Sequence, residues 1–275
     1  MQGVSRGSLG AVREKLDSVF AASTKKAAEA QRQVAEELFA VLDLLDANAQ
    51  LRRMLSDPAV DSDRKARLAA DIFGEKLSAQ TSEILEAVVR APWGRPSDLI
   101  AAIDELAAQA LFATAEKVNV LDDVEDELFR FGRILDREPR LRSALTDPAL
   151  PDDRKTELIE ALLSGRVQDS TLVLVREVVL RPRGRTIDRA LEEYGRLAAA
   201  RRERLVAQVR TVVALTDEQL EMLGAALAAR LGHQVHLNVE LDPELIGGLT
   251  VRVGDILFDA SIAHRLALAR RVMTG

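Results

Sequence analysis

Three histidines are the side chains of this sequence that most resemble metal ligands: His233, His236 and His264. His233 and His236 lie three positions apart in an alternating apolar segment. In a β-strand that spacing turns two side chains to opposite faces, so the pair cannot converge on one metal ion. We therefore interpret the histidines as surface residues and expect no metal site.

Carboxylates and glycines near the C-terminus have residue types that serve in catalysis or nucleotide binding. Asp255 and Asp259 could form a general acid and base pair, but a turn and a helix cap account for both. Gly247-Gly248 lacks the further glycines of a dinucleotide-binding fingerprint and the lysine of a phosphate-binding loop. The chain contains no cysteine, which excludes a thiolate nucleophile. We predict no catalytic residue and no cofactor.

Arginines gather in the segment 181–210 and could contact an acidic partner. Acidic residues are interleaved with them, which favours a solvated helix face. The net charge of the whole chain is -6, and this argues against a general nucleic-acid binder, because phosphate affinity depends on clustered positive charge. The arginines are Arg181, Arg183, Arg185, Arg189, Arg196, Arg201, Arg202, Arg204 and Arg210, and the acidic residues are Asp188, Glu192, Glu193 and Glu203.

The composition indicates which elements must position these side chains. The chain has 275 residues, of which 47% are hydrophobic and 3% aromatic. That is enough for two or three domains with cores of Leu, Val, Ile and Ala, and it favours helices. No apolar run reaches the roughly 18–20 residues that span a bilayer. The N-terminus has no apolar signal core; its Arg and Ser residues would suit a transit peptide, but the segment has a place in the repeat described next, and we expect a cytoplasmic protein.

An internal repeat with an offset of 90 residues organises the helical part of the chain. The segment from Leu51 to Leu68 returns as Leu141 to Leu158. The same register holds upstream, where Glu37-Leu38-Phe39 matches Glu127-Leu128-Phe129. One helical unit is therefore present twice.

Helical periodicity predicts that each unit is a bundle of short helices. In the second unit an apolar stripe at helical spacing comprises Leu121, Val124, Leu128, Phe131 and Leu135. The predicted helices of the first unit are 8–23, 27–46, 48–55, 61–73, 79–90 and 97–117. Those of the second unit are about 121–135, a short helix ending at 145, then 151–163, 169–180 and 186–202.

The C-terminal segment predicts a small mixed domain. Thr216 and Gln219 form a capping box that starts one helix, and Ser261 is the N-cap of another. Gly254-Asp255 is the turn of a two-residue hairpin. Alternating apolar residues predict strands at 205–214, 233–241, 249–253 and 256–258.

The sequence therefore predicts a mainly α fold, with two tandem bundles of short helices followed by a small α+β C-terminal domain. The predicted domains are an extra N-terminal bundle at 1–104, a second bundle at 105–204 and the C-terminal domain at 205–275. By the offset, the helix at 97–117 closes the first bundle, and its sequence also resembles the opening helix of a known family of helical domains, which implies that it opens the second bundle.

The stretch from Val239 to Arg271 contains the pattern DPxLIGGxxVxxGDxxxDxS, followed by an apolar helix. It resembles the C-terminal signature of the delta subunit of F-type ATP synthases, whose mitochondrial relative is the oligomycin-sensitivity-conferring protein. Ala260 departs from the glycine usual in that family, and alanine would be strained there if the position needs positive φ. The matching residues are Asp242, Pro243, Leu245, Ile246, Gly247, Gly248, Val251, Gly254, Asp255, Asp259, Ser261 and Leu266.

The resemblance covers 105–275 as a complete family member, and 1–104 looks like the extra partial copy of some long bacterial forms. It implies a non-catalytic stator subunit at the cytoplasmic face of the bacterial plasma membrane, which contacts the membrane only through the ATP synthase complex. In the family, an apolar groove between the first and fifth helices holds an N-terminal helix of an alpha subunit, and the C-terminal part engages the b subunit. Carried onto this sequence, the groove would be lined by Leu106, Ala110, Ala113, Thr171, Val175 and Val178, which also suit a bundle core.

Two questions stay open at the level of sequence. A helical adaptor unrelated to ATP synthase would share the repeat, although it would not need the signature. The sequence also leaves open which bundle receives the alpha-subunit helix. We expect the second, because it aligns with the complete family member.

Overall fold

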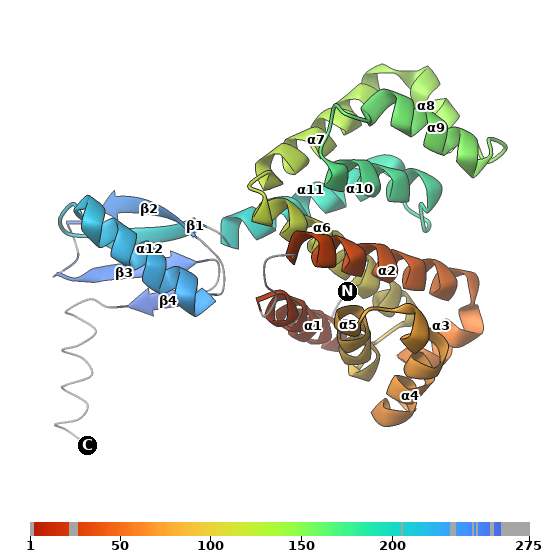
Figure 1. Cartoon of the computed structure of the whole chain (residues 1–275), viewed down its shortest axis with the longest axis horizontal. Helices are drawn as coiled ribbons and strands as arrows, with labels where there is room; N and C mark the ends of the chain where they lie inside the picture. Colours follow the sequence, from red (N-terminus) through yellow and green to blue (C-terminus); the bar gives the residue numbers. More distant parts are fainter. Residues whose placement is uncertain are drawn as a thin grey trace. The chain divides into compact units, whose positions relative to one another are not determined.

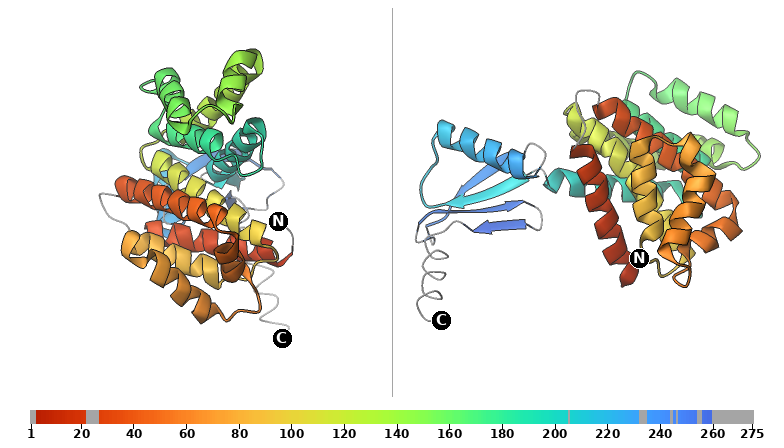
Figure 2. Two further views of the ribbon diagram at one scale, coloured as in Figure 1. Left: turned by 90° about the vertical axis from the view of Figure 1, so that its right-hand side faces the viewer. Right: turned by 60° about the horizontal axis from the view of Figure 1, so that its bottom comes forward.

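The computed structural model of the chain describes residues 3–21, 27–204, 206–231, 235–243, 245, 247–253 and 256–259 (Figure 1). The chain forms two compact units, Met1–Ala198 and Ala199–Gly275. The first unit is helical and the second contains a sheet, and each is described by itself (Figure 2).

The first unit begins with the helices of the first repeat copy. They are α1 (Val4–Ala21), α2 (Ala27–Ala47), α3 (Ala49–Ser56), α4 (Ser62–Phe73), the short 3-10 helix η1 (Gly74–Lys76), α5 (Ala79–Arg90) and α6 (Pro96–Lys117). Side chains cap three of these helices at their N-termini: Asn48 caps α3, Asp61 caps α4 and Ser78 caps α5. Each predicted helix of this copy is present, with ends shifted by a few residues.

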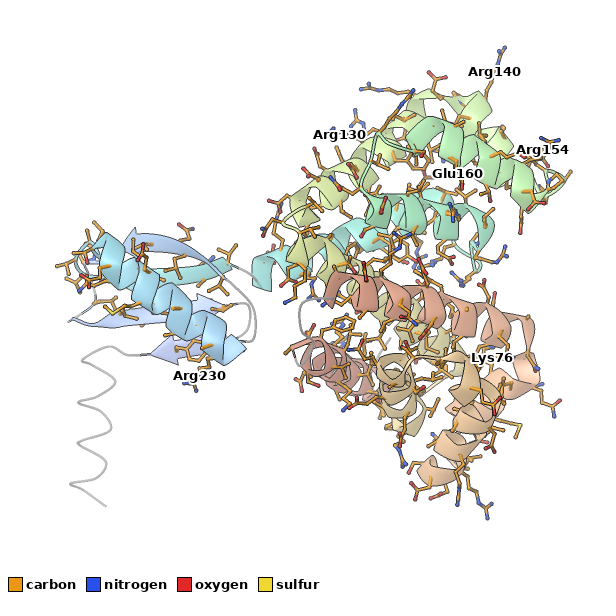
Figure 3. All side chains as sticks on the ribbon, viewed as in Figure 1. Lys76, Arg130, Arg140, Arg154, Glu160 and Arg230 are labelled. Atoms are coloured by element: carbon orange, nitrogen blue, oxygen red, sulfur yellow. The ribbon has the colours of Figure 1, made fainter. Side chains whose placement is uncertain are left out.

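The helices of the second copy follow in the same order. They are α7 (Leu121–Arg137), α8 (Pro139–Thr146), α9 (Asp152–Leu163), α10 (Asp169–Leu180) and α11 (Ile187–Arg204). The apolar stripe predicted on α7 is buried at all five positions, whereas Arg130, Arg140 and Arg154 point outward from α7, α8 and α9 (Figure 3). The mainly helical prediction for this region is confirmed.

Both copies contain the same polar contact between their second and fifth helices. Glu37 of α2 accepts hydrogen bonds of 2.9 Å from the backbone N–H and from the hydroxyl of Ser78, at the start of α5. Glu127 of α7 accepts a 2.9 Å bond from the backbone N–H of Gln168, before α10, and a 2.6 Å bond from the hydroxyl of Thr171. In each copy, a carboxylate thus satisfies donors at the N-terminus of the fifth helix, where negative charge is favoured.

Three helices, α1, α6 and α11, occupy equivalent places in the repeat and bury different faces. On α1 the buried face includes Leu9, Val12 and Leu16, and the equivalent Leu99, Ala102 and Leu106 of α6 are also buried. On α11 the corresponding positions are exposed and polar: Arg189, Glu192 and Arg196. This face of the helix is buried on α1 and α6, each of which is followed by the helices of a copy. It is exposed on α11, which is followed by the sheet unit.

The opposite face shows the reverse pattern. Tyr194 and Ala198 of α11 are buried, as are the equivalent Asp104 and Ala108 of α6. On α1 the equivalent positions are Glu14 and Ser18, both exposed. Only α6 buries both faces, and it packs against α1, α2, α3 and α5 as well as against α7 and α10. The boundary predicted between residues 104 and 105 falls inside α6, and the division into two separate bundles stays a prediction.

The second unit is a four-stranded sheet with one described helix, α12 (Asp217–Leu231). The strands are β1 (Val206–Thr211), β2 (His236–Leu241), β3 (Leu249–Val253) and β4 (Ile256–Asp259), in the order β2-β1-β3-β4. Strand β1 is parallel to β2, whereas β3 is antiparallel to both β1 and β4. The antiparallel return after the predicted hairpin is confirmed, and β1 and β2 are shorter than predicted.

The core of the sheet unit is small and aliphatic. Its buried residues are Ala207, Val209, Leu227, Val251 and Val253. The predicted capping box is present at the start of α12, where Thr216 N–H donates to the side chain of Gln219 at 3.0 Å and Gln219 N–H donates to Thr216 Oγ1 at 3.3 Å. Arg230 (Figure 3) lies over the ring of Phe258, with its guanidinium carbon 5.0 Å from the centroid.

Candidate partner-binding site

The six residues predicted to line a groove lie in the interior of the helical unit. Leu106, Ala110 and Ala113 come from α6, and Thr171, Val175 and Val178 come from α10. The two helices pack against each other, and every one of the six side chains is 2% exposed or less. The structure therefore brings the two predicted walls together as packed core.

The first copy shows that burial at these positions does not require a partner. Leu16 and Phe20 of α1 are the equivalents of Leu106 and Ala110, and both are buried. On α5, Thr81, Leu85 and Val88 correspond to Thr171, Val175 and Val178, and these too are buried. The assignment of the six residues to a partner site stays a prediction.

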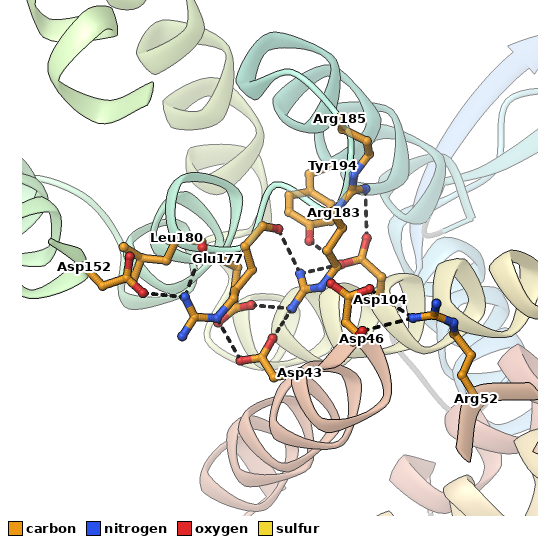
Figure 4. Close-up of polar contacts among 11 residues, drawn as sticks. Asp43, Asp46, Arg52, Asp104, Asp152, Glu177, Leu180, Arg183, Arg185 and Tyr194 are labelled. Carbon is orange, nitrogen blue, oxygen red and sulfur yellow. Dashed lines mark hydrogen bonds and ion pairs between the residues drawn. The ribbon is translucent and has the colours of Figure 1, made fainter. Parts of the chain in front are cut away.

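A cluster of charged side chains lies where the two copies meet (Figure 4). We call it the junction cluster; it consists of Asp43 from α2, Asp104 from α6, Glu177 from α10, Arg181, Arg183 and Arg185 from the loop after α10, and Tyr194 from α11. Arg183 is central, because it pairs with Asp43 at 2.7 Å, with Glu177 at 3.1 Å and with Asp104 at 3.4 Å. Its side chain is only 4% exposed.

Asp104 is the buried acceptor of the junction cluster. Its Oδ1 accepts a 2.9 Å hydrogen bond from the hydroxyl of Tyr194, and its Oδ2 lies 2.9 Å from a guanidinium nitrogen of Arg185. The same guanidinium lies over the ring of Tyr194, 5.8 Å from its centroid. A buried carboxylate needs such partners, because an unpaired charge in the interior costs far more than a surface charge.

The environment of the cluster shifts the proton affinities of its members. Burial raises the pKa of the Tyr194 phenol well above its ordinary value, and the Asp104 charge raises it further. Burial also raises the pKa of Glu177, although Arg183 opposes that shift. For Arg185, burial lowers the pKa, but interactions with Asp104, Tyr194 and Glu193 together outweigh burial, and the net pKa is raised. The arginine and the tyrosine therefore keep their protons, and the cluster serves as a set of ion pairs that joins helices of both copies.

The solvated-face interpretation of the arginine segment is wrong for Arg183 and Arg185. Their side chains are 4% and 19% exposed and pair with acidic residues of α6, α10 and α11. It holds for Arg189, which is exposed on α11. It also fails for Arg201, which is 9% exposed on α11. Helical periodicity could not identify Arg183 and Arg185 as buried, because both lie in a loop. The available indication was Asp104, a charged residue that shares one side of α6 with the apolar Ala108 and Leu111.

Four of the signature residues, Asp242, Pro243, Gly247 and Gly248, lie around the turn between β2 and β3. Asp242 is buried, pairs with Arg210 at 2.5 Å and donates its backbone N–H to Thr211 O at 2.8 Å. Pro243 is exposed, and Asp259 ends β4. Gly247 and Gly248 have φ values of +134° and +81°, which other residues adopt only with strain. The glycine pair thus shapes a turn, while Ile246, Gly254, Asp255 and Ser261 lie outside the described residues.

Two further features are absent from the described part of the chain. Among those residues, no three metal-ligating side chains lie close enough together to hold an ion. No described helix has the length and apolarity that crossing a bilayer requires.

Comparison with known proteins places the chain among ATP synthase subunits. The family model described as "ATP synthase delta (OSCP) subunit" matches twice, over residues 17–107 and over 103–273. A protein of Streptomyces avermitilis named ATP synthase subunit delta is 45% identical over 99% of this chain and 98% of its own length. A protein of the same name from Thermobifida fusca is 43% identical over the full length of both.

A solved structure entitled as the mitochondrial ATP synthase hexamer of Toxoplasma gondii also matches. One of its chains is 22% identical over 61% of this chain and 95% of that chain, with a TM-score of 0.32. A likeness this low carries no argument about the fold.

The two matches of the family model overlap at residues 103–107, inside the helix that is packed against both copies.

Proposed function

Because this chain belongs to the ATP synthase delta (OSCP) family, we propose that it is a peripheral-stalk subunit that links the catalytic head of ATP synthase to the stalk. It is a structural subunit and is not itself catalytic. By holding the head to the stalk, it would prevent the head from turning with the rotor during proton-driven ATP synthesis. The observation that carries the proposal is the sequence identity of 45% and 43% to two relatives named ATP synthase subunit delta, over nearly the full length of each chain.

The junction cluster supports a role under mechanical load. Ion pairs join α2 of the first copy to the loop after α10, and the same loop is joined to α6 and α11. The continuous α6 connects both copies without a linker. The described helical unit is therefore built to respond to a pull as one body rather than as two bundles on a flexible tether.

We propose two partners, both subunits of the same complex. The first is an N-terminal helix of an alpha subunit, received by the helical unit, and the second is the b subunit, received by the C-terminal part. An amphipathic helix binds an apolar groove through residues at i, i+3, i+4 and i+7. The predicted place for the alpha-subunit helix is beside Leu106, Ala110, Ala113, Thr171, Val175 and Val178, between α6 and α10.

We also propose that the chain acts at the cytoplasmic face of the bacterial plasma membrane and contacts the membrane only through the complex. Its full-length relatives are named as subunits of ATP synthase, a complex that includes a membrane part. This placement needs no spanning helix of its own. The alternative of a helical adaptor unrelated to ATP synthase does not account for the full-length relatives.

Depletion of the chain in cells tests the proposed function. Without it, ATP hydrolysis activity should leave the membrane fraction and appear in the soluble fraction, because the head has lost its attachment to the stalk. Re-expression of the intact chain should return the activity to the membranes. If the activity stays membrane-bound and coupled to proton transport without the chain, the proposal is wrong.

A further inference from the structure

Ion pairs connect α2 of the first copy to both ends of α10 of the second copy. Near the start of α2, Arg32 pairs with Asp169, the first residue of α10, at 3.1 Å. Eleven residues later Asp43 pairs with Arg181 at 3.2 Å and with Arg183 at 2.7 Å, directly after the end of α10. Eleven residues also separate Asp169 from Leu180, so the ion pairs have the same spacing on both helices and the two helices run in the same direction. Figure 4 shows the Asp43 end of this pairing.

The same side of α2 carries a buried phenylalanine. Phe39 is seven positions after Arg32 and four before Asp43, and at 3.6 residues per turn the three side chains share one side of the helix. Phe39 is 4% exposed. Since ion pairs to both ends of α10 flank it, Phe39 lies on the side of α2 that is turned toward the second copy.

The second copy provides a matched comparison. Phe129 of α7 is the repeat equivalent of Phe39 and is 64% exposed. The two residues are identical in type and in helix position. They differ in that a further copy follows α2, whereas the sheet unit follows the copy that contains α7. The two copies therefore differ in how this position is covered, and the ion pairs of Arg32 and Asp43 place Phe39 on the side of α2 that faces α10.

The charges on α7 make this docking specific for α2. Asp122 and Arg133 are the repeat equivalents of Arg32 and Asp43, so both signs are reversed. If α7 of another molecule took the place of α2, Asp122 would meet Asp169, and Arg133 would meet Arg181 and Arg183. Like charges at both ends oppose that pairing, and repulsion of this kind is how a site rejects a related helix.

We propose that α2 is a built-in ligand of the surface formed by α6 and α10, and that it competes there with any helix from a partner. The inference rests on the proposed function, in which an alpha-subunit helix binds between the same two helices. Helix α2 packs along α6 and pairs with both ends of α10, so it covers the approach to this surface. A partner helix can bind there only in the fraction of molecules in which α2 has moved, and its apparent affinity falls by that fraction.

The test compares three full-length chains: the intact protein, the double variant Arg32→Ala/Asp43→Ala and the control Asp122→Ala/Arg133→Ala. The first variant removes the ion pairs between α2 and α10, and the control removes the equivalent charges from α7. The probe is a synthetic peptide of the alpha-subunit N-terminus, titrated by calorimetry. We expect the Arg32→Ala/Asp43→Ala chain to bind it about tenfold more tightly than the other two, the change that two weakened ion pairs would give. Circular dichroism confirms that each chain is folded.

Hydrogen exchange provides a readout that does not depend on the peptide. Amides of α10 should exchange faster in Arg32→Ala/Asp43→Ala and at the original rate in the control. If the intact chain binds the peptide as tightly as the double variant, α2 is not a competitor and the inference is wrong, although the proposed function survives. If no chain binds the peptide, the alpha-subunit part of the proposed function fails. Unchanged exchange in α10 would then also refute the role of α2, whereas faster exchange would uphold it as a built-in ligand.

Discussion

The hydroxyl of Tyr194 donates a 2.9 Å hydrogen bond to Oδ1 of Asp104, and the two residues are 90 positions apart, the offset of the repeat. Each occupies the same place in its copy, on α11 and on α6. The bond therefore joins two equivalent positions of the duplicated unit to each other. Such a contact has no counterpart inside a single copy and could arise only after the duplication.

Removal of this hydroxyl should weaken the helical unit. Tyr194→Phe leaves a buried carboxylate with one hydrogen bond fewer, and bonds to charged groups contribute about 1.5–3 kcal/mol. We expect a loss of that size in urea unfolding followed by circular dichroism. Glu192→Gln, on the exposed side of the same helix, should leave the midpoint unchanged. Equal midpoints for Tyr194→Phe and the original chain would mean that the junction cluster contributes nothing to stability.

The phenylalanine pair gives a second prediction. Phe39→Ala removes a side chain that is 4% exposed and should cost about 3–5 kcal/mol of unfolding free energy. Phe129→Ala, at the equivalent exposed position, should change it by no more than about 0.5 kcal/mol. Denaturant melts of the two variants measure both values. Similar losses at the two positions would contradict the burial of Phe39 against the second copy.

Acid should destabilise the protein partly through Glu37. Burial alone raises the pKa of Glu37, but hydrogen bonds from Thr81, Ser78 and Gln33 together lower it below the ordinary value of 4.5. A carboxylate whose pKa is lower in the folded state stabilises the fold above its unfolded pKa, and that stability is lost as the pH falls through the folded value.

Glu37→Gln has no titratable group at this position. Comparison of this variant with the original chain therefore isolates the contribution of the Glu37 carboxylate to the pH dependence of stability. The difference in stability between the original chain and Glu37→Gln should be largest near pH 6 and should shrink as the pH falls below about 4.5. Urea midpoints measured from pH 6 to pH 3 provide the comparison. A difference that stays constant over that range would exclude the Glu37 carboxylate as a source of acid sensitivity.

The glycine pair of the signature gives a prediction for the sheet unit. Gly248→Ala places a side chain at φ +81° and should cost about 1–2 kcal/mol. Gly224→Ala lies within α12, where the new Cβ would be an ordinary 3.9 Å from Leu237, and should stabilise by about 0.5–1 kcal/mol. Hydrogen exchange of the β1 amides reports on this unit alone. Shifts of the same sign in both variants would contradict the turn role of Gly248.

The elements and their order were predictable from the sequence because local chemistry determines them. The stripe through Leu128, the capping box at Thr216 and the turn at Gly247-Gly248 depend on neighbours a few residues away. The 90-residue offset of the repeat then predicted the helices of one copy from those of the other. The six predicted groove residues came from the family resemblance, and as mostly apolar positions at helical spacing they suit a core and a partner surface equally.

Neighbours far along the chain determine the features that the sequence left open. Phe39 and Phe129 occupy equivalent positions in matching tripeptides, yet one is buried and the other is exposed, so their surroundings differ although their local sequences do not. Arg183 has an environment that Asp43, Asp104 and Glu177 create together, from three helices. Local periodicity does not indicate which distant residues meet in the fold. It therefore predicted a solvated face for the loop arginines as well.

If this chain joins the catalytic head of ATP synthase to the stalk, purification of the complex should recover all three together. The chain would be tagged in its own cells, and the complex would be isolated in mild detergent and cross-linked. We expect the alpha and b subunits to copurify with the chain and ATP hydrolysis activity to elute with it. Mass spectrometry should find cross-links from the helical unit to the alpha-subunit N-terminus and from the C-terminal unit to b. A tagged chain that elutes free of the alpha subunit, while ATPase activity elutes elsewhere, would contradict the account.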